Sequence, residues 1–175
     1  MPCMVEKPLA LQAPDPHIKI RPVRLTDVPE LHEVCWPERS VAYVSQLIHR
    51  SRQIALQGRG LGVVAVGREA KDVQGFGQMT LWPRGGEISD LVVGSCYRRR
   101  GLGTAIIQYL VQVAREMYAS SVEIGVAMDN TAALALYRRL GFTDDYTVML
   151  NLGNGPEPVI YLQLELPPPE SRSAG

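Results

Sequence analysis

The sequence predicts an α/β (α+β) fold, with a mixed, mostly antiparallel central sheet of about seven strands flanked by about four helices. Three observations indicate this class. Short apolar runs, some alternating with polar residues, are typical of strands. Residues 83–86, Pro-Arg-Gly-Gly, are the turn residues of a hairpin between two such runs. Later runs alternate with stretches of helical spacing, and such a pattern gives a sheet with helices on its faces.

In chain order, residues 18–24 alternate apolar and basic side chains, as a half-buried strand does. Thr26 or Asp27 is expected to cap a first helix, and Ser40 a second helix that runs to about residue 56. The remaining strands are expected at residues 62–66, 73–82, 87–93, 121–128, 146–150 and 159–166.

Two further helices are expected in the second half of the chain. The stronger signal covers residues 102–118, where apolar residues recur at helical spacing from Leu102 to Met117. The other covers residues 130–140 and is followed by Gly141, which is expected to end it in a left-handed C-cap.

These elements fill residues 18–166, which we interpret as a single domain with a sizeable core, because the whole chain has 175 residues. Residues 1–17 lack periodicity and are interpreted as a flexible, Pro-rich lead-in. Residues 167–175 are interpreted as a flexible, Pro-rich tail that continues neither a strand nor a helix.

Composition disfavours several classes of partner. Eighteen Lys and Arg residues balance eighteen Asp and Glu residues, so net charge gives no reason to expect nucleic acid or a membrane surface. The three cysteines and three histidines are scattered and lack the spacing of a disulfide framework or a metal site. No apolar run approaches the roughly 20 residues that span a bilayer. The sequence therefore predicts a cytoplasmic protein without a metal.

The most informative segment joins the strand at residues 87–93 to the helix at residues 102–118. A helix N-terminus offers unpaired amides and positive charge, glycines let phosphates approach, and arginines add fork-shaped donors. These features suit a pyrophosphate-binding site. The alternative is a solvated turn before a helix, which has the same local pattern. The P-loop pattern and the full dinucleotide fingerprint are both absent. The segment ends in Arg98, Arg99, Arg100, Gly101, Leu102, Gly103 and Thr104.

This segment resembles the acetyl-CoA-binding motif of the GNAT superfamily of N-acetyltransferases, Arg/Gln-x-x-Gly-x-Gly/Ala, with Arg98, Gly101 and Gly103 at its fixed positions. Residues 130–142, Asn-x-x-Ala-x-x-Leu-Tyr-x-x-x-Gly-Phe, are similar to the helix that follows in this family. Two motifs in the right order are more specific than either alone, and residues 18–166 can be placed in the family's strand order. Ser95 departs from the proline of many members but leaves the glycines in place.

The resemblance implies direct transfer of an acetyl group from acetyl-CoA to a primary amine in a ternary complex. The pyrophosphate would bind the segment from Arg98 to Thr104 named above. The pantetheine arm would pair like a strand with Leu91, Val92 and Val93, and an amide near Val93 would polarise the acetyl carbonyl. This requires the strand that contains them to splay away from the strand at residues 121–128.

Glu87 is the expected base, because it resembles the glutamate that several family members use at this place. An alkylammonium acceptor with a pKa near ~10.4 must lose a proton before it can attack. Asp90 is the alternative base. In a regular strand the two carboxylates point to opposite faces, so only one would face the cleft unless a bulge intervenes. Glu87 also fits a solvated carboxylate beside a turn.

Tyr137 is the expected general acid, because the family commonly places this tyrosine beside the coenzyme sulfur. The alternative is a tyrosine that only packs its helix against the core. Asn130 is expected to bind the pantetheine arm, to cap its helix, or both. A covalent role for Cys96 is disfavoured, because direct transfer needs no acyl-cysteine.

Several alternatives stay open. A non-catalytic acyl-CoA-binding regulatory module would keep the same loop, as would an acyltransferase with a longer donor such as succinyl-CoA. A third alternative is an interaction protein that uses exposed aromatic residues around Trp82. The acceptor is a protein N-terminus or a small-molecule amine, and the sequence lacks an acidic cluster that would attract a polyamine. A homodimer through the last strands is also possible for this family.

Overall fold

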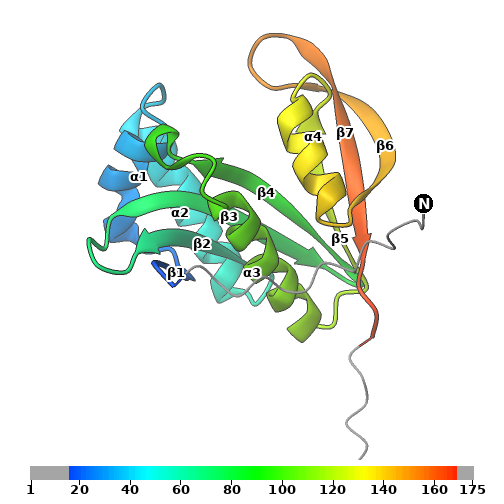
Figure 1. Cartoon of the computed structure of the whole chain (residues 1–175), viewed down its shortest axis with the longest axis horizontal. Helices are drawn as coiled ribbons and strands as arrows, with labels where there is room; N and C mark the ends of the chain where they lie inside the picture. The colour runs from blue at the N-terminus through cyan, green and yellow to red at the C-terminus, as the bar shows by residue number, and fades with distance from the viewer. Residues whose placement is uncertain (1–15, 169–175) are drawn as a thin grey trace, which may run out of the picture.

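The computed structural model describes residues 16–168, so the expected lead-in at 1–17 and tail at 167–175 lie almost entirely outside the described residues. The described chain forms one seven-stranded sheet in the order β1-β2-β3-β4-β5-β7-β6 (Figure 1). Neighbouring strands are antiparallel except β4 and β5, which are parallel. The strands are β1 (Ile18–Pro22), β2 (Gly60–Gly67), β3 (Val73–Trp82), β4 (Gly85–Val93), β5 (Ser121–Ala127), β6 (Thr143–Asn151) and β7 (Pro156–Glu165).

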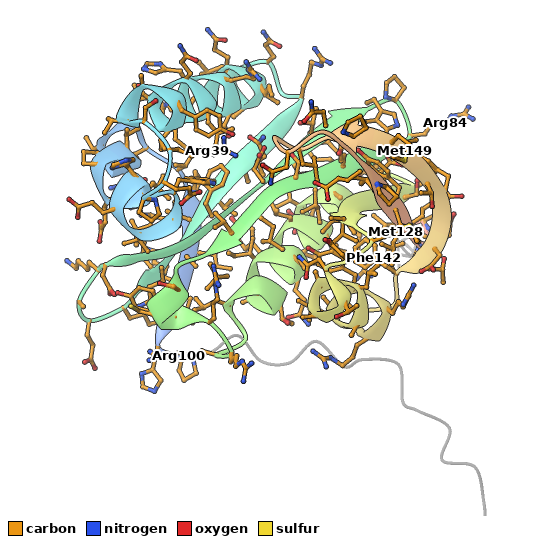
Figure 2. All side chains as sticks on the ribbon, turned by 90° about the horizontal axis from the view of Figure 1, so that it is seen from above. Arg39, Arg84, Arg100, Met128, Phe142 and Met149 are labelled. Carbon is orange, nitrogen blue, oxygen red and sulfur yellow. The ribbon has the colours of Figure 1, made fainter. Side chains whose placement is uncertain are left out.

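Helices cover both faces of this sheet, as the view from above shows (Figure 2). One face packs α1 and α2 on a core around Leu31 and Phe76, and the other packs α3 and α4 on a core around Ile106 and Ile124. The predicted fold class is therefore confirmed. The α-helices of the described residues are α1 (Val28–Cys35), α2 (Val41–Leu56), α3 (Leu102–Glu116) and α4 (Thr131–Arg139), with 3-10 turns η1 (Leu25–Asp27) and η2 (Ser95–Tyr97).

The boundaries differ most from the prediction in the last hairpin. β6 starts at Thr143 and β7 at Pro156, so the expected loop at residues 151–158 shrinks to residues 152–155. β6 lies at the edge of the sheet and nearly all of its side chains are exposed. Its sequence therefore lacks the alternation that would have revealed where it begins.

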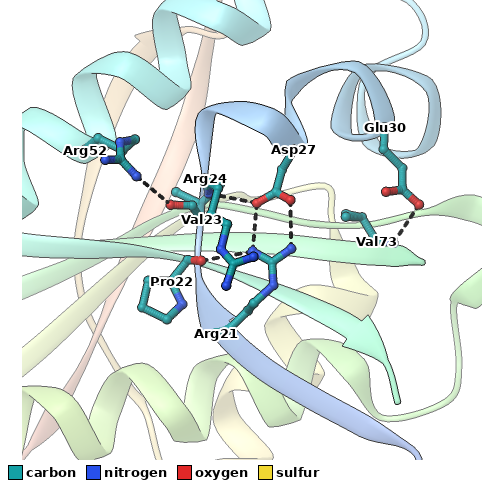
Figure 3. A network of polar contacts seen from close by, with 8 residues as sticks. All are labelled: Arg21, Pro22, Val23, Arg24, Asp27, Glu30, Arg52 and Val73. Atoms are coloured by element: carbon teal, nitrogen blue, oxygen red, sulfur yellow. Dashed lines mark hydrogen bonds and ion pairs between the residues drawn. The ribbon is translucent and has the colours of Figure 1, made fainter. Parts of the chain in front are cut away.

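The start of α1 also differs from the prediction, because Asp27 does not cap it with its side chain. The carboxylate instead accepts hydrogen bonds from the Arg21 guanidinium at 2.7 and 2.8 Å and from the Arg24 amide at 2.7 Å (Figure 3). Burial alone would raise the pKa of Asp27, but these bonds and the guanidinium charge lower it below its ordinary value. The predicted cap of α2 is confirmed, since the Ser40 hydroxyl accepts from the Tyr43 amide at 3.1 Å.

The sheet opens between β4 and β5. The two strands pair only over Gly85 to Ile88 and Ser121 to Ile124, which leaves the second half of β4 without a neighbour on that side. α4, β6 and β7 lie across the opening from β4 (Figure 1). The expected splay is therefore present, and backbone groups of β4 along it are free to pair with a ligand.

A β-bulge in β4 changes which face its residues occupy. Residues 76–78 of β3 oppose residues 89–92 of β4, so β4 has one extra residue there. Asp90 lies in this bulge with a left-handed φ of 51°. Its carboxylate accepts a hydrogen bond from Gln78 Nε2 at 2.6 Å, and Gln78 projects from the same sheet face as Glu87. The opposite orientations expected for a regular strand therefore do not occur here, because the bulge brings the Glu87 and Asp90 carboxylates to one face.

Candidate active site

The N-terminus of α3 borders a groove of about 540 Å³. The first hydrogen bond of the helix runs from the Ala105 amide to the Gly101 carbonyl at 3.0 Å. The amides of Leu102, Gly103 and Thr104 therefore have no acceptor within the helix, and they add to its positive end. The groove is lined by Val93, Tyr97, Arg98, Arg99, Gly101, Leu102, Gly103, Thr104, Ala132, Ala133, Leu136 and Arg139.

Gly101 and Gly103, at the start of α3, differ in whether the backbone conformation requires glycine. Gly101 has a φ of 78°, which is left-handed and favours glycine. Gly103 has no such φ, and a Cβ there would lie 4.0 Å from Leu136 and Val93, which is ordinary contact. The protein's own packing therefore does not explain the glycine at 103, and the space above it remains for another molecule.

The three arginines of the loop have different surroundings. Arg98 and Arg99 line the groove, and Arg98 Nε donates to the Val93 carbonyl at 3.3 Å. Arg100 does not line it; its guanidinium lies 5.9 Å from the centre of the Tyr97 ring. Figure 2 shows Arg100 at the periphery of the molecule. The structure thus brings two of the three predicted arginines to the groove.

Tyr97 anchors this loop to the turn between β2 and β3. Its hydroxyl donates to Asp72 Oδ2 at 2.8 Å. The bond raises the pKa of Tyr97 and lowers that of Asp72. Sequence reasoning missed this anchor, because no local pattern links two residues so far apart in the chain.

A second cavity of about 480 Å³ lies between the end of α1 and the end of β4. Val93 and Arg98 line this cavity as well as the groove at α3, so the two spaces meet at the end of β4. Leu91 and Val92 line only the second cavity. Its lining is completed by Val34, Cys35, Trp36, Pro37, Glu38, Asp90 and Ser95.

Glu87 is half-buried among other acidic groups. Burial raises its pKa, and the negative charges of Glu123 and Asp90 raise it further, while hydrogen bonding with Tyr161 opposes the shift. Within residues 16–168 no Lys, Arg or His side chain forms an ion pair with these three carboxylates. The expectation that the protein lacks an acidic cluster was therefore wrong, because the fold assembles one from β4 and β5.

Tyr137 projects from the buried face of α4 and is 7% exposed. Its carbonyl accepts from the Phe142 amide at 3.0 Å, which closes the predicted left-handed C-cap at Gly141, where φ is 97°. Burial raises the pKa of Tyr137 to about 12, so its hydroxyl stays protonated at neutral pH. The side chain does not line the groove, whereas its helix neighbours Ala133 and Leu136 do.

Asn130 caps α4, which is one of the two roles expected for it. Its side-chain oxygen accepts from the Ala133 amide at 3.2 Å, and it does not line the groove. Four of the predicted site residues thus line neither of these two cavities, namely Glu87, Arg100, Asn130 and Tyr137. The other predicted donor-site residues line one or both.

Within residues 16–168 no helix combines the length and the apolar character needed to cross a bilayer. In the same part of the chain, no three His, Cys, Asp or Glu side chains are arranged to hold a metal ion.

A splayed sheet, a glycine-containing helix start beside the opening and a carboxylate on the strand that leads there define a class of acyl-transfer protein. The sequence model described as the acetyltransferase (GNAT) family matches residues 25–142. The chain belongs to this family of N-acetyltransferases.

Individual relatives agree with this placement. The chain is 28% identical over 134 residues to an N-alpha-acetyltransferase of Sulfurisphaera tokodaii, which covers 72% of this chain and 80% of that protein. It is 35% identical over 72 residues to N-alpha-acetyltransferase 30 of Xenopus laevis, which covers 41% of this chain and 26% of that protein. The matched region is about a quarter of the length of two curated relatives.

A solved structure shows the same fold. It is RimL, a ribosomal L7/L12 alpha-N-protein acetyltransferase in complex with coenzyme A, with a TM-score of 0.76 and 15% sequence identity. The alignment covers 88% of this chain and 97% of that one.

Proposed function

We propose that this protein transfers an acetyl group from acetyl-CoA to the N-terminal amine of a protein or peptide in the cytoplasm. The observation that carries the proposal is the open N-terminus of α3, where Gly103 faces a groove that meets the second cavity at Val93. The two N-alpha-acetyltransferase relatives support an N-terminal amine as the acceptor.

The donor would bind in two parts. Its pyrophosphate would accept from the free amides at Leu102 to Thr104 and from the guanidinium groups of Arg98 and Arg99. Its pantetheine amides would pair with the free edge of β4 at residues 91–93, because the splay leaves no strand there. Asn130 and Arg100 would contribute from the rim of the groove.

The chemistry requires the acceptor nitrogen to lose two protons and the coenzyme sulfur to gain one. Glu87 would take the first proton from the ammonium, so that the nitrogen lone pair attacks the thioester carbonyl carbon. An amide near Val93 would stabilise the negative oxygen of the tetrahedral intermediate. As the carbon–sulfur bond breaks, the Tyr137 hydroxyl would protonate the thiolate and recover the second proton from the nitrogen through solvent. The products are an N-acetylated amine and coenzyme A thiol.

A small polyamine is the second candidate acceptor. The observation that favours it is the acidic cluster of Glu87, Asp90 and Glu123, which has no basic partner among the described residues. Such a cluster attracts a polycation more strongly than it attracts a single ammonium group.

Calorimetric titration with acetyl-CoA, coenzyme A and ATP tests the donor site. We expect both coenzyme A species to bind and ATP to bind much more weakly, because the pantetheine arm accounts for part of the affinity. A folded protein that binds none of them would refute the proposal at its first step.

The acceptor is then tested by coenzyme A release with a panel of peptides, the same peptides with acetylated N-termini, and spermidine. Turnover confined to free N-termini supports the proposal, whereas turnover with spermidine alone supports the polyamine. Repeating the assay with succinyl-CoA tests a longer donor. Tight acetyl-CoA binding without turnover of any amine would support a non-catalytic binding module instead.

A further inference from the structure

Glu123 lies directly beside Glu87, because the two residues are partners in the short parallel ladder of β4 and β5. Their sequence neighbours Ile88, Val122 and Ile124 are buried in the core under α3 and α4. Both carboxylates therefore project from the opposite face of the sheet. They belong to neighbouring strands about 4.8 Å apart, so two negative charges are held close together.

Two stacked tyrosines hold this pair of carboxylates. The Tyr146 hydroxyl on β6 donates to the Glu123 carboxylate, with oxygen–oxygen distances of 3.2 and 3.3 Å. The Tyr146 ring stacks on the Tyr161 ring of β7, with centroids 4.9 Å apart and planes 7° from parallel. Tyr161 in turn lies close enough to Glu87 for the two side chains to shift each other's pKa. The stack thus links the two carboxylates, because Tyr146 is bonded to Glu123 and Tyr161 lies beside Glu87.

Gly125 on β5 makes the position of this stack possible. It is the register partner of Tyr161, and a Cβ at 125 would lie only 2.9 Å from the tyrosine ring. The ring can therefore lie across β5 only because residue 125 has no side chain. Four strands, β4 to β7, contribute to one arrangement centred on Glu87.

We propose that Glu123 is a positioning residue for acetyl transfer that acts through Glu87, with Tyr146 and Tyr161 fixing the separation of the two carboxylates. The inference rests on the proposed role of Glu87 as the base. A nearby negative charge disfavours ionisation, so Glu87 holds a proton more strongly beside Glu123 than it would alone. A carboxylate of higher proton affinity is a better base for an ammonium acceptor.

Among the charged groups near Glu87, Glu123 has the largest effect. Glu87 is flanked by Asp90 on its own strand and Tyr161 on β7, and its partner on β3 is the uncharged Thr80. The charge of Glu123 raises the pKa of Glu87 more than the charge of Asp90 does.

The test compares the wild type with Glu123→Gln and with Glu165→Gln as a matched control. Glu165 is an exposed glutamate on the same face of β7 as Tyr161, near the far end of the strand. Carbon-13 NMR of side-chain carboxyl groups follows the titration of Glu87, whose signal is assigned with Glu87→Gln. We expect Glu87 to titrate at lower pH in Glu123→Gln and to be unchanged in Glu165→Gln.

Turnover provides the second readout. Glu123→Gln should lower kcat by up to about tenfold, because Glu87 is a weaker base without the neighbouring negative charge, and should leave acetyl-CoA affinity unchanged. Tyr146→Phe keeps the ring stack and should lower kcat in the same way. Glu87→Gln should lower kcat by about 10²- to 10⁴-fold.

The outcomes separate this inference from the proposed function. Full turnover by Glu87→Gln would refute the base and the positioning role together. A large loss in Glu87→Gln, combined with an unmoved Glu87 titration in Glu123→Gln, would refute the positioning role alone. An equal shift in Glu123→Gln and Glu165→Gln would also refute it, since the effect would then be a general one of net charge.

Discussion

Replacing Gly103 with alanine separates a ligand-binding role of this glycine from a role in folding. Gly103 is the second residue of α3, and the added methyl group would meet Leu136 and Val93 only at 4.0 Å. Alanine is a better helix former than glycine by up to about 1 kcal/mol. The free energy of unfolding of Gly103→Ala should therefore equal that of the wild type or exceed it by up to about 1 kcal/mol.

Binding should change in the opposite direction. The methyl group would occupy the space beside the free amides of Leu102, Gly103 and Thr104. If the pyrophosphate loses one charge-assisted hydrogen bond there, the cost is about 1.5–3 kcal/mol. Acetyl-CoA affinity should then fall by roughly 10- to 100-fold. Gly103→Glu, which adds a larger side chain with a negative charge, should abolish binding.

The assay pairs calorimetric titration with acetyl-CoA and thermal unfolding of the same samples without ligand. Gly101→Ala serves as a comparison, because its left-handed φ of 78° should make alanine destabilising by about 1–2 kcal/mol. A stable Gly103→Ala protein with wild-type affinity for acetyl-CoA would show that the start of α3 does not hold the pyrophosphate.

Three further predictions concern catalysis, stability and the carboxylate pair. Tyr137→Phe should lower kcat far more than it weakens acetyl-CoA binding, and equal losses in both would assign Tyr137 to packing alone. Asp27→Asn should lower the free energy of unfolding by about 1.5–3 kcal/mol at neutral pH, since it removes a charged partner of Arg21. Because the folded-state pKa of Asp27 is lowered, this difference should be lost as pH falls through that pKa, and a pH-independent difference in urea unfolding would contradict the assignment. Gly125→Ala should displace the Tyr161 ring and lower kcat with little loss of thermal stability, whereas wild-type kcat would show that the ring position does not matter.

The features that were predictable from sequence depend on residues close together in the chain. The cap by Ser40 and the left-handed turn at Gly141 each involve contacts within five positions, and both are confirmed. The open start of α3 follows from a glycine pair at the end of a loop. These elements could be located because side-chain chemistry and backbone conformation act over one helical turn.

The features that escaped prediction depend on pairing between distant strands. The bulge at Asp90 exists only because β4 pairs with β3 in a shifted register. Glu123 approaches Glu87 only because β4 and β5 are parallel neighbours, although α3 separates them in the sequence. The stack of Tyr146 on Tyr161 depends likewise on the pairing of β6 with β7. Alternation within one strand carries no information about which strand lies beside it.

The shortness of the β4–β5 ladder connects the donor and acceptor halves of the proposed site. The ladder ends at Ile88 and Ile124, and beyond this point the edge of β4 is free to pair with a pantetheine arm. One residue before this end, the ladder still holds Glu87 and Glu123 side by side, on the sheet face opposite to α3 and α4. A longer ladder would close the donor path, and a shorter one would separate the two carboxylates. In the proposed mechanism, the same end point therefore determines both where the acetyl group enters and how strongly Glu87 holds its proton.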